Sequence, residues 1–141
     1  MTRRVLLGLL LLSATACSAA RSEPDPKNQL PFGWVDEPAA GSEIQRGQVS
    51  ASGWALDDTG VAEVRVFLDD HFVARASVTE SRPDVTKTYP TFAHGNDVHG
   101  WRVNVPFGAG ATLGPHNLLF QAVDKDGASH DIATVPVKIE H

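Results

Sequence analysis

The segment VAEVRVFLDDHFVARASV, residues 61–78, decides the fold because apolar side chains recur in it at every second position. The alternation runs through residues 64–68 and, after Asp69-Asp70-His71, through residues 72–78. A period of two is typical of half-buried β-strands. The segment therefore predicts two strands joined by a tight hairpin.

Three segments nearer the C-terminus extend this pattern. Residues 101–107 and 133–139 also alternate, whereas residues 116–123 are apolar on both faces, as expected of a central strand. Pro136 cannot donate a hydrogen bond to a neighbouring strand, so we expect the last strand to lie at an edge or to carry a bulge there.

Earlier in the chain, residues 49–56 predict a strand that is interrupted by Gly53. A glycine inside a strand often marks a kink or bulge, and we expect this one to turn Trp54 toward the core. Aspartate and glycine cluster in Asp57-Asp58-Thr59-Gly60 and in Asp124-Lys125-Asp126-Gly127, which are typical turn sequences.

Short strands separated by such turns predict an all-β protein, an antiparallel β-sandwich, and no helical period is present after the first residues. We expect the two sheets to bury Trp54, Phe72, Trp101 and Phe120 between them. With one cysteine in the sequence no disulfide can form within the chain, so the sandwich has to be stabilised by packing.

The N-terminus has the three parts of an export signal. Arg3 and Arg4 precede an apolar run over residues 5–12, and small residues follow up to Ala16. The run is much shorter than the roughly 20 apolar residues that span a bilayer. Residues 1–16 are therefore predicted to be a cleaved signal peptide.

The end of this signal, Ser13-Ala14-Thr15-Ala16-Cys17, resembles the lipobox of bacterial lipoproteins, with Ala14 where leucine is commoner. The resemblance implies that Cys17 is lipidated and becomes the first residue of a membrane-anchored protein of the bacterial cell envelope, facing the periplasm or the cell surface. Ala14-Thr15-Ala16 also fits the ordinary signal peptidase, which would release a soluble periplasmic protein. Residues 17–30, which are polar and contain two prolines, are predicted to be a flexible linker, and residues 31–141 to be one domain.

The domain resembles the bacterial immunoglobulin-like domain, which implies a sandwich of about seven strands. Such modules occur in bacterial surface and secreted proteins and generally lack activity of their own. The motifs that carry the resemblance are Gly53-Trp54-Ala55-Leu56-Asp57, residues 60–69, Arg82-Pro83-Asp84-Val85 with Tyr89-Pro90, Gly100-Trp101 and Asp124-Lys125-Asp126-Gly127.

Residues 80–99 form an unusually long connection that needs internal contacts to be ordered. We expect a helical turn that begins at Pro83, is capped by Ser81 and ends at Tyr89, because Pro90 follows. Arg82 is placed to pair with Asp84 or another carboxylate, and Tyr89 and Phe92 to pack on the sheet. These residues are expected to hold the segment in place, with ligand binding as the alternative.

Metal-binding and catalytic signals are weak. His94, Asp97 and His99 match no strong zinc spacing, and the aspartates of the two turns serve turn geometry more simply than calcium. None of the common hydrolase, metalloprotease or phosphate-loop motifs is present, so we expect no enzyme activity, no metal and no cofactor. The net charge of -5 argues against nucleic acid as a partner.

Two functions remain open at this point. The first is a non-catalytic envelope lipoprotein whose domain binds a partner protein near the membrane. The alternative is a glycan-binding accessory module, in which Trp34, Phe67, Tyr89 or Trp101 would stack on sugar rings. The candidate binding residues are Trp34, Phe67, Arg82, Asp84 and Tyr89.

Overall fold

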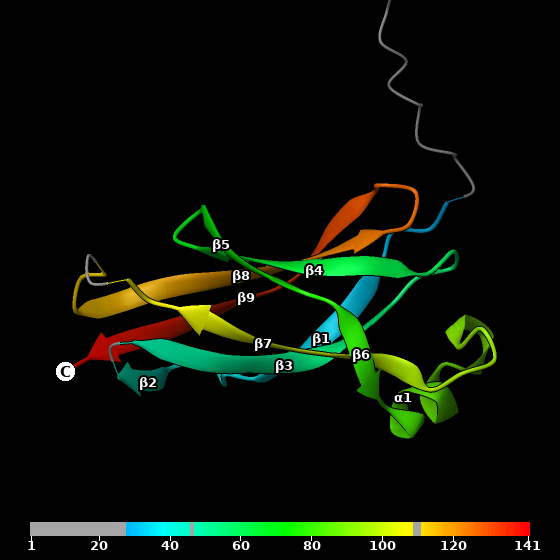
Figure 1. Ribbon diagram of the computed structural model, residues 1–141, viewed down its shortest axis with the longest axis horizontal. Helices are drawn as coiled ribbons and strands as arrows, with labels where there is room; N and C mark the ends of the chain where they lie inside the picture. The colour runs from blue at the N-terminus through cyan, green and yellow to red at the C-terminus, as the bar shows by residue number, and fades with distance from the viewer. Residues whose placement is uncertain (1–27, 46, 109–110) are drawn as a thin grey trace, which may run out of the picture.

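Two sheets pack face to face in the computed structural model of the chain, which describes residues 28–45, 47–108 and 111–141 (Figure 1). The predicted signal peptide, Cys17 and the linker up to residue 27 lie outside the described residues. One sheet has the order β1-β3-β7-β6 and the other β2-β9-β8-β4-β5. Their bounds are β1 Phe32–Glu37, β2 Ser42–Gln45, β3 Gln48–Leu56, β4 Val61–Leu68, β5 His71–Ala76, β6 Val78–Ser81, β7 Val98–Pro106, β8 Gly114–Asp124 and β9 Ser129–Glu140. Between β6 and β7 lie helix α1, Pro83–Thr88, and the 3-10 helix η1, Pro90–Phe92.

The all-β sandwich is thus confirmed, although the described part has nine strands where about seven were expected. The sequence analysis missed β1 and β2. The single strand expected over residues 72–78 is divided at Ser77 between β5 of one sheet and β6 of the other. Strand pairs are antiparallel except that β2 runs parallel to β9.

The hairpin between β4 and β5 is as tight as predicted, because Leu68 pairs directly with His71. Asp69 and Asp70 have φ angles of 46° and 68°, as two-residue hairpin turns require. Asp69 also ties the turn to β8: its Oδ1 accepts a hydrogen bond of 2.9 Å from the Asn117 N–H, and its Oδ2 bonds the ring of His116. The bond to Asp69 is the main cause of the raised pKa of His116.

The expected burial of Phe72 is wrong. The pairing of β4 with β5 shifts between Val66 and Phe67, so that Phe72 faces Phe67 and Val73 is the extra residue. Such a bulge moves side chains to the opposite face. Phe72 therefore lies on the outer face and is 52% exposed, while Val73 packs against the core.

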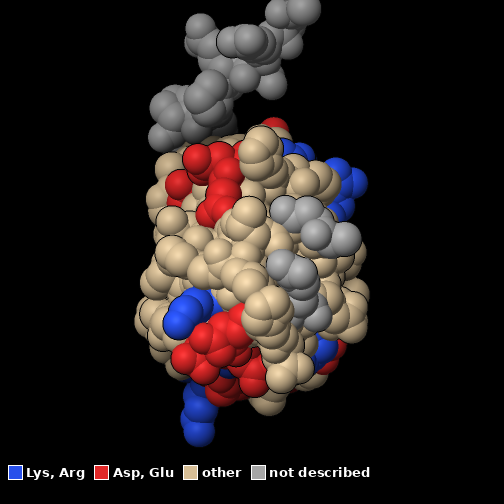
Figure 2. All heavy atoms as spheres, turned by 90° about the vertical axis from the view of Figure 1, so that its left-hand side faces the viewer, with Lys and Arg blue, Asp and Glu red and all other residues tan. Residues whose placement is uncertain are grey.

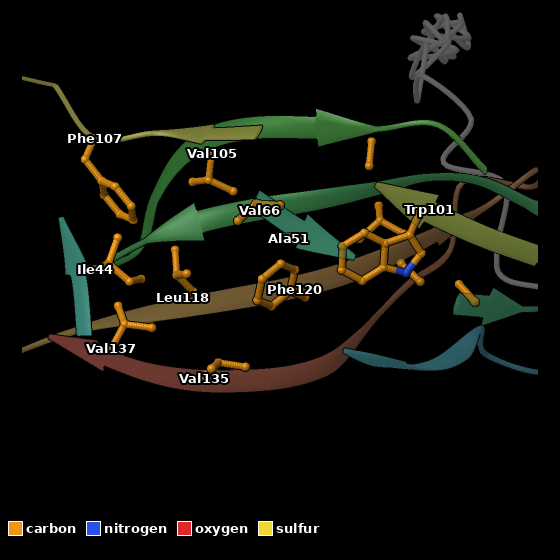
Figure 3. Close-up of a cluster of buried hydrophobic side chains, with 14 of the residues drawn as sticks. Ile44, Ala51, Val66, Trp101, Val105, Phe107, Leu118, Phe120, Val135 and Val137 are labelled. Carbon is orange, nitrogen blue, oxygen red and sulfur yellow. The ribbon is translucent and has the colours of Figure 1, made fainter. Parts of the chain in front are cut away.

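The core contains the other two expected large side chains, Trp101 and Phe120 (Figure 3). Both are fully buried, and their rings stack with centroids 5.4 Å apart. Trp101 comes from β7 and Phe120 from β8, so this contact joins the two sheets. Aromatic burial of this kind is a large source of stability.

Trp54 was also expected to be buried in the core, and this expectation is wrong. The register of β3 against β7 is continuous from Gln48 to Trp54, so β3 has no bulge at Gly53. The irregularity at this level lies in β1, between Val35 and Glu37. Gly53 faces inward instead, and a Cβ atom there would lie 2.7 Å from Cζ2 of Trp101. Since successive side chains alternate, Trp54 faces outward.

The last strand is not an edge strand, because β9 lies between β2 and β8, and it has no bulge at Pro136. Pro136 nevertheless lies where one side of β9 has no partner strand. β2 pairs with β9 only from Val137 to Glu140, so Pro136 lies just before the paired section. Its carbonyl accepts a hydrogen bond of 2.7 Å from the Gly41 N–H. The nitrogen of a strand residue points to the same side as its carbonyl, and the missing N–H therefore costs no bond to β8.

Figure 2 looks onto the end of the sandwich that carries the β4–β5 turn and the C-terminus. Acidic side chains gather in two groups on this end, with basic ones at their margins. Asp69 and Asp70 belong to the turn and Glu140 to the last strand. A ligand approaching from this side meets mainly negative charge.

We predict that Gly53→Ala lowers the free energy of unfolding by about 1 to 3 kcal/mol, as overpacking of a dense core does. The added methyl would also lie 2.0 Å from the carbonyl oxygen of Trp34. Gly108→Ala is the matched control, because nothing lies within 4 Å of a Cβ at that position. Urea denaturation of the two variants measures the difference, and equal stability would contradict the close contact.

Candidate functional site

The outer face of the four-stranded sheet carries the most exposed tryptophan of the described residues. Trp34 of β1 pairs with the outward-facing Trp54 of β3, and paired residues of antiparallel strands share a face. Val35, the next residue, packs against the core. The side chain of Trp34 is therefore directed away from the core and is 62% exposed.

Four rings pack together beside Trp34 and form an aromatic cluster. Phe32 contacts three of them edge to face, with centroid distances of 6.0 Å to Trp54, 5.3 Å to Tyr89 and 5.1 Å to Phe92. Trp54 and Tyr89 are 5.4 Å apart. The predicted packing of Tyr89 and Phe92 on the sheet is confirmed, and it covers the side chain of Trp54.

Arg82 crosses the same face from the end of β6. Its Cγ would lie 2.9 Å from a Cβ at Gly100, so the side chain passes over this glycine. The guanidinium donates two hydrogen bonds to Asp84, of 3.0 and 2.9 Å, and one of 2.7 Å from Nη1 to Oδ2 of Asp36 in β1. The pair with Asp84 is confirmed, and Asp36 is a second carboxylate partner whose identity the sequence did not indicate. Arg82 thus joins α1 to the opposite edge of the sheet.

These contacts shift the pKa values of the partners in opposite directions. The hydrogen bonds to Asp84, and then those to Asp36, raise the pKa of Arg82, although burial works against this. The bonds from Arg82 hold the pKa of the exposed Asp84 below its ordinary value. Arg82 and Asp84 are consequently both charged near neutral pH.

Helix α1 begins at Pro83 and ends before Tyr89, as predicted, but Ser81 does not cap it. Ser81 belongs to β6 and pairs with Val98. Arg82 occupies the capping position and makes no side-chain capping bond. Ser81 lies one residue before the capping position, because the helix begins only at Pro83.

Two of the proposed aromatic ligand contacts are not on this face. Phe67 lies on the outer face of the other sheet, where its ring is 5.8 Å from that of Phe72, and Arg75 lies 5.7 Å above Phe72. Trp101 is fully buried and cannot stack on a sugar. The structure therefore brings together Trp34, Arg82, Asp84 and Tyr89 and separates Phe67 from them.

A polar strip that the sequence analysis did not single out continues this face away from the aromatic cluster. Ser50 pairs with Asn104 and Ser52 with Arg102 across β3 and β7. Arg102 and Asn104 are exposed, and Nη1 of Arg102 lies 3.5 Å from Oγ of Ser50. The alternation of Arg102 and Asn104 with Trp101 and Val105 indicates that the two polar side chains face outward. It does not indicate whether other elements cover that face.

The aspartates considered for calcium stabilise turns. Oδ2 of Asp57 accepts hydrogen bonds from the N–H and hydroxyl of Thr59, and Oδ1 of Asp124 accepts from the N–H groups of Asp126 and Ala128. Burial is the main cause of the raised pKa of Asp57. Within the described ranges, no three His, Cys, Asp or Glu side chains are grouped so as to hold a metal ion.

Comparison with known proteins supports the fold. No protein-family model and no curated protein matches the sequence. Among solved structures, the chain is similar to the fibronectin(III)-like modules of CbhA from Clostridium thermocellum, with a TM-score of 0.52 and 21% identity over 76% of this chain and 93% of the other. The fold is an immunoglobulin-like β-sandwich. A Niemann-Pick type C2 protein from the Japanese carpenter ant overlaps less well, with a TM-score of 0.45 and 10% identity over 82% and 97% of the two chains.

We predict that Arg82→Lys lowers the free energy of unfolding by about 1 kcal/mol, because lysine cannot reproduce the fork that bonds Asp84 and Asp36 together. Arg102→Lys serves as control, since its contact with Ser50 is long. Chemical denaturation at low and high salt measures both variants. The same stability in Arg82→Lys as in the parent chain would show that the bridge over the sheet does not hold α1.

Proposed function

We propose that the chain is a non-catalytic bacterial lipoprotein, anchored at the cell envelope through Cys17, whose sandwich binds a partner protein through the outer face of the four-stranded sheet. The observation that carries the binding face is the 62% exposure of Trp34. Tryptophan is enriched among the residues that dominate binding energy at protein interfaces. An exposed one beside a rigid aromatic cluster is a preformed anchor for a ligand.

The anchor rests on the sequence around Cys17. In the described part of the chain, no helix has the length and apolar character needed to cross a bilayer. Asn28 donates a hydrogen bond of 2.9 Å to Asp124, and the Gln29 N–H donates one to Asp58. The last residues of the predicted linker are therefore bonded to the turns at one end of the sandwich.

Glycan binding is the second candidate, and the polar strip is the observation that favours it. The face combines an exposed indole with the exposed polar side chains of Ser50, Arg102 and Asn104. Sugars present apolar C–H faces that pack on aromatic rings and hydroxyl groups that bond polar side chains. The same face therefore suits either a partner protein or a glycan.

We predict that the mature protein begins at Cys17 and carries acyl groups. Intact mass measurement of protein extracted from membranes should exceed the mass of residues 17–141 by that of the lipid. Cys17→Ala should move the protein from the membrane fraction to the soluble fraction, because the anchor is removed. An unmodified N-terminus on the parent protein in the soluble fraction would contradict lipidation and favour the periplasmic alternative.

We predict that Trp34→Ala weakens ligand capture from envelope extracts at least about tenfold, as loss of a central aromatic anchor does. Phe72→Ala is the matched control, because Phe72 is 52% exposed on the opposite outer face. Protease treatment of the extract should abolish capture of a protein, and periodate oxidation should abolish capture of a glycan. Equal capture by Trp34→Ala and Phe72→Ala would contradict the assignment of the face.

A further inference from the structure

A cavity of about 430 Å³ opens at one end of the sandwich, between the segment over residues 92–99 and the turns after β3 and β8. Its volume is within the range of small-molecule sites in proteins. Apolar side chains, among them Val61, Val78 and Phe92, form part of its lining. Phe92 is also a member of the aromatic cluster, but Trp34 and Arg82 do not line the cavity.

His99 lines the cavity and is only 4% exposed, so the fold fixes its ring. Oγ1 of Thr86 lies 2.9 Å from Nε2 of His99 and 3.3 Å from the carbonyl oxygen of Asn96. Nδ1 of His99 has no hydrogen-bond partner among the described residues, and an imidazole nitrogen can accept or donate according to its tautomer.

His94 lies on the same cavity and is held in a costly conformation. Its φ angle is 51°, a backbone region that residues other than glycine seldom adopt. Nε2 of His94 donates a hydrogen bond of 2.9 Å to the carbonyl oxygen of Asp57, which comes from another turn. The other ring nitrogen, Nδ1, makes no hydrogen bond with the described residues, and the bond of Nε2 keeps the ring in place.

Donors are supplied by two further lining residues. Oδ1 of Asn96 accepts a hydrogen bond of 2.8 Å from the Val98 N–H, which leaves the Nδ2 group to donate. Lys125 contributes its ammonium group and forms no ion pair with the described residues. The cavity thus offers acceptors and donors beside an apolar lining that includes one aromatic ring.

We propose that this cavity binds a small neutral polyhydroxylated molecule, such as a single sugar ring or a cyclic polyol. Each hydroxyl group both donates and accepts, which matches the mixed polar groups, and the C–H face of a ring matches the apolar lining. A small anion is disfavoured by Asp57 and its neighbours Asp58 and Asp124. A cation is disfavoured by Lys125. The site does not depend on the proposed function of the sheet face.

The test is a titration of the purified isotope-labelled chain with glucose, galactose, N-acetylglucosamine and myo-inositol, followed by NMR. At least one of them should shift the amide signals of Asn96, Val98 and His99. Asn96→Asp keeps the acceptor for the Val98 N–H but removes the Nδ2 donor, and should weaken the affinity about tenfold. His71→Ala, in the exposed β4–β5 hairpin, should leave the affinity unchanged.

Three results would overturn the proposal. One is the absence of shifts at the cavity for all four probes at millimolar concentration. Another is tighter binding of gluconate or glucosamine, which would assign the cavity to a charged ligand. The third is unchanged sugar binding by Val98→Phe, which places a ring at the 45% exposed Val98 of the lining and serves in place of Asn96→Asp if that variant does not fold.

Discussion

The packing of Trp101 over Gly53 determines how the rest of the sandwich is arranged. The absence of a side chain at Gly53 lets the indole lie against β3 while its ring stacks on Phe120 of the second sheet. Once Gly53 faces inward, strand geometry directs Trp54 outward, and pairing with β1 places Trp34 on the same face. The core contact therefore decides which aromatic residues are exposed to ligands.

Without a disulfide, the long connection between β6 and β7 is ordered by side-chain contacts that span the sheet. Arg82 bonds a residue of α1 and a residue of β1, and Tyr89 and Phe92 pack on Phe32. Asp36, which receives the bond from the guanidinium, is the extra residue of a bulge between Val35 and Glu37. An irregularity in an edge strand thus completes the bridge.

The sequence was sufficient for features that depend on neighbours along the chain. Period-two strands, the hairpin at Asp69-Asp70, the helical turn from Pro83 and the Arg82–Asp84 pair are all local, and all are found. Two local features were nevertheless missed, since Ser81 does not cap α1 and the strands β1 and β2 were not predicted. The other errors concern faces and long-range partners. The bulge at Val73 moves the side chain of Phe72 to the outer face of the sheet. Whether this bulge forms depends on the sequence of β4 as much as on that of β5. The partner Asp36 and the cavity are formed by segments far apart in sequence, which periodicity does not relate to one another.

The two candidate sites differ in how their geometry is fixed, and this decides how they can be separated. Trp34 is held by strand pairing, whereas His99 contacts Thr86 of α1 and His94 is bonded to the turn after β3. Phe92 belongs to both the aromatic cluster and the cavity lining, so a substitution there changes both sites. Trp34 and Asn96 each belong to one site only. Independent loss of binding at these two positions would establish two sites, and joint loss would indicate that the segment between β6 and β7 couples them.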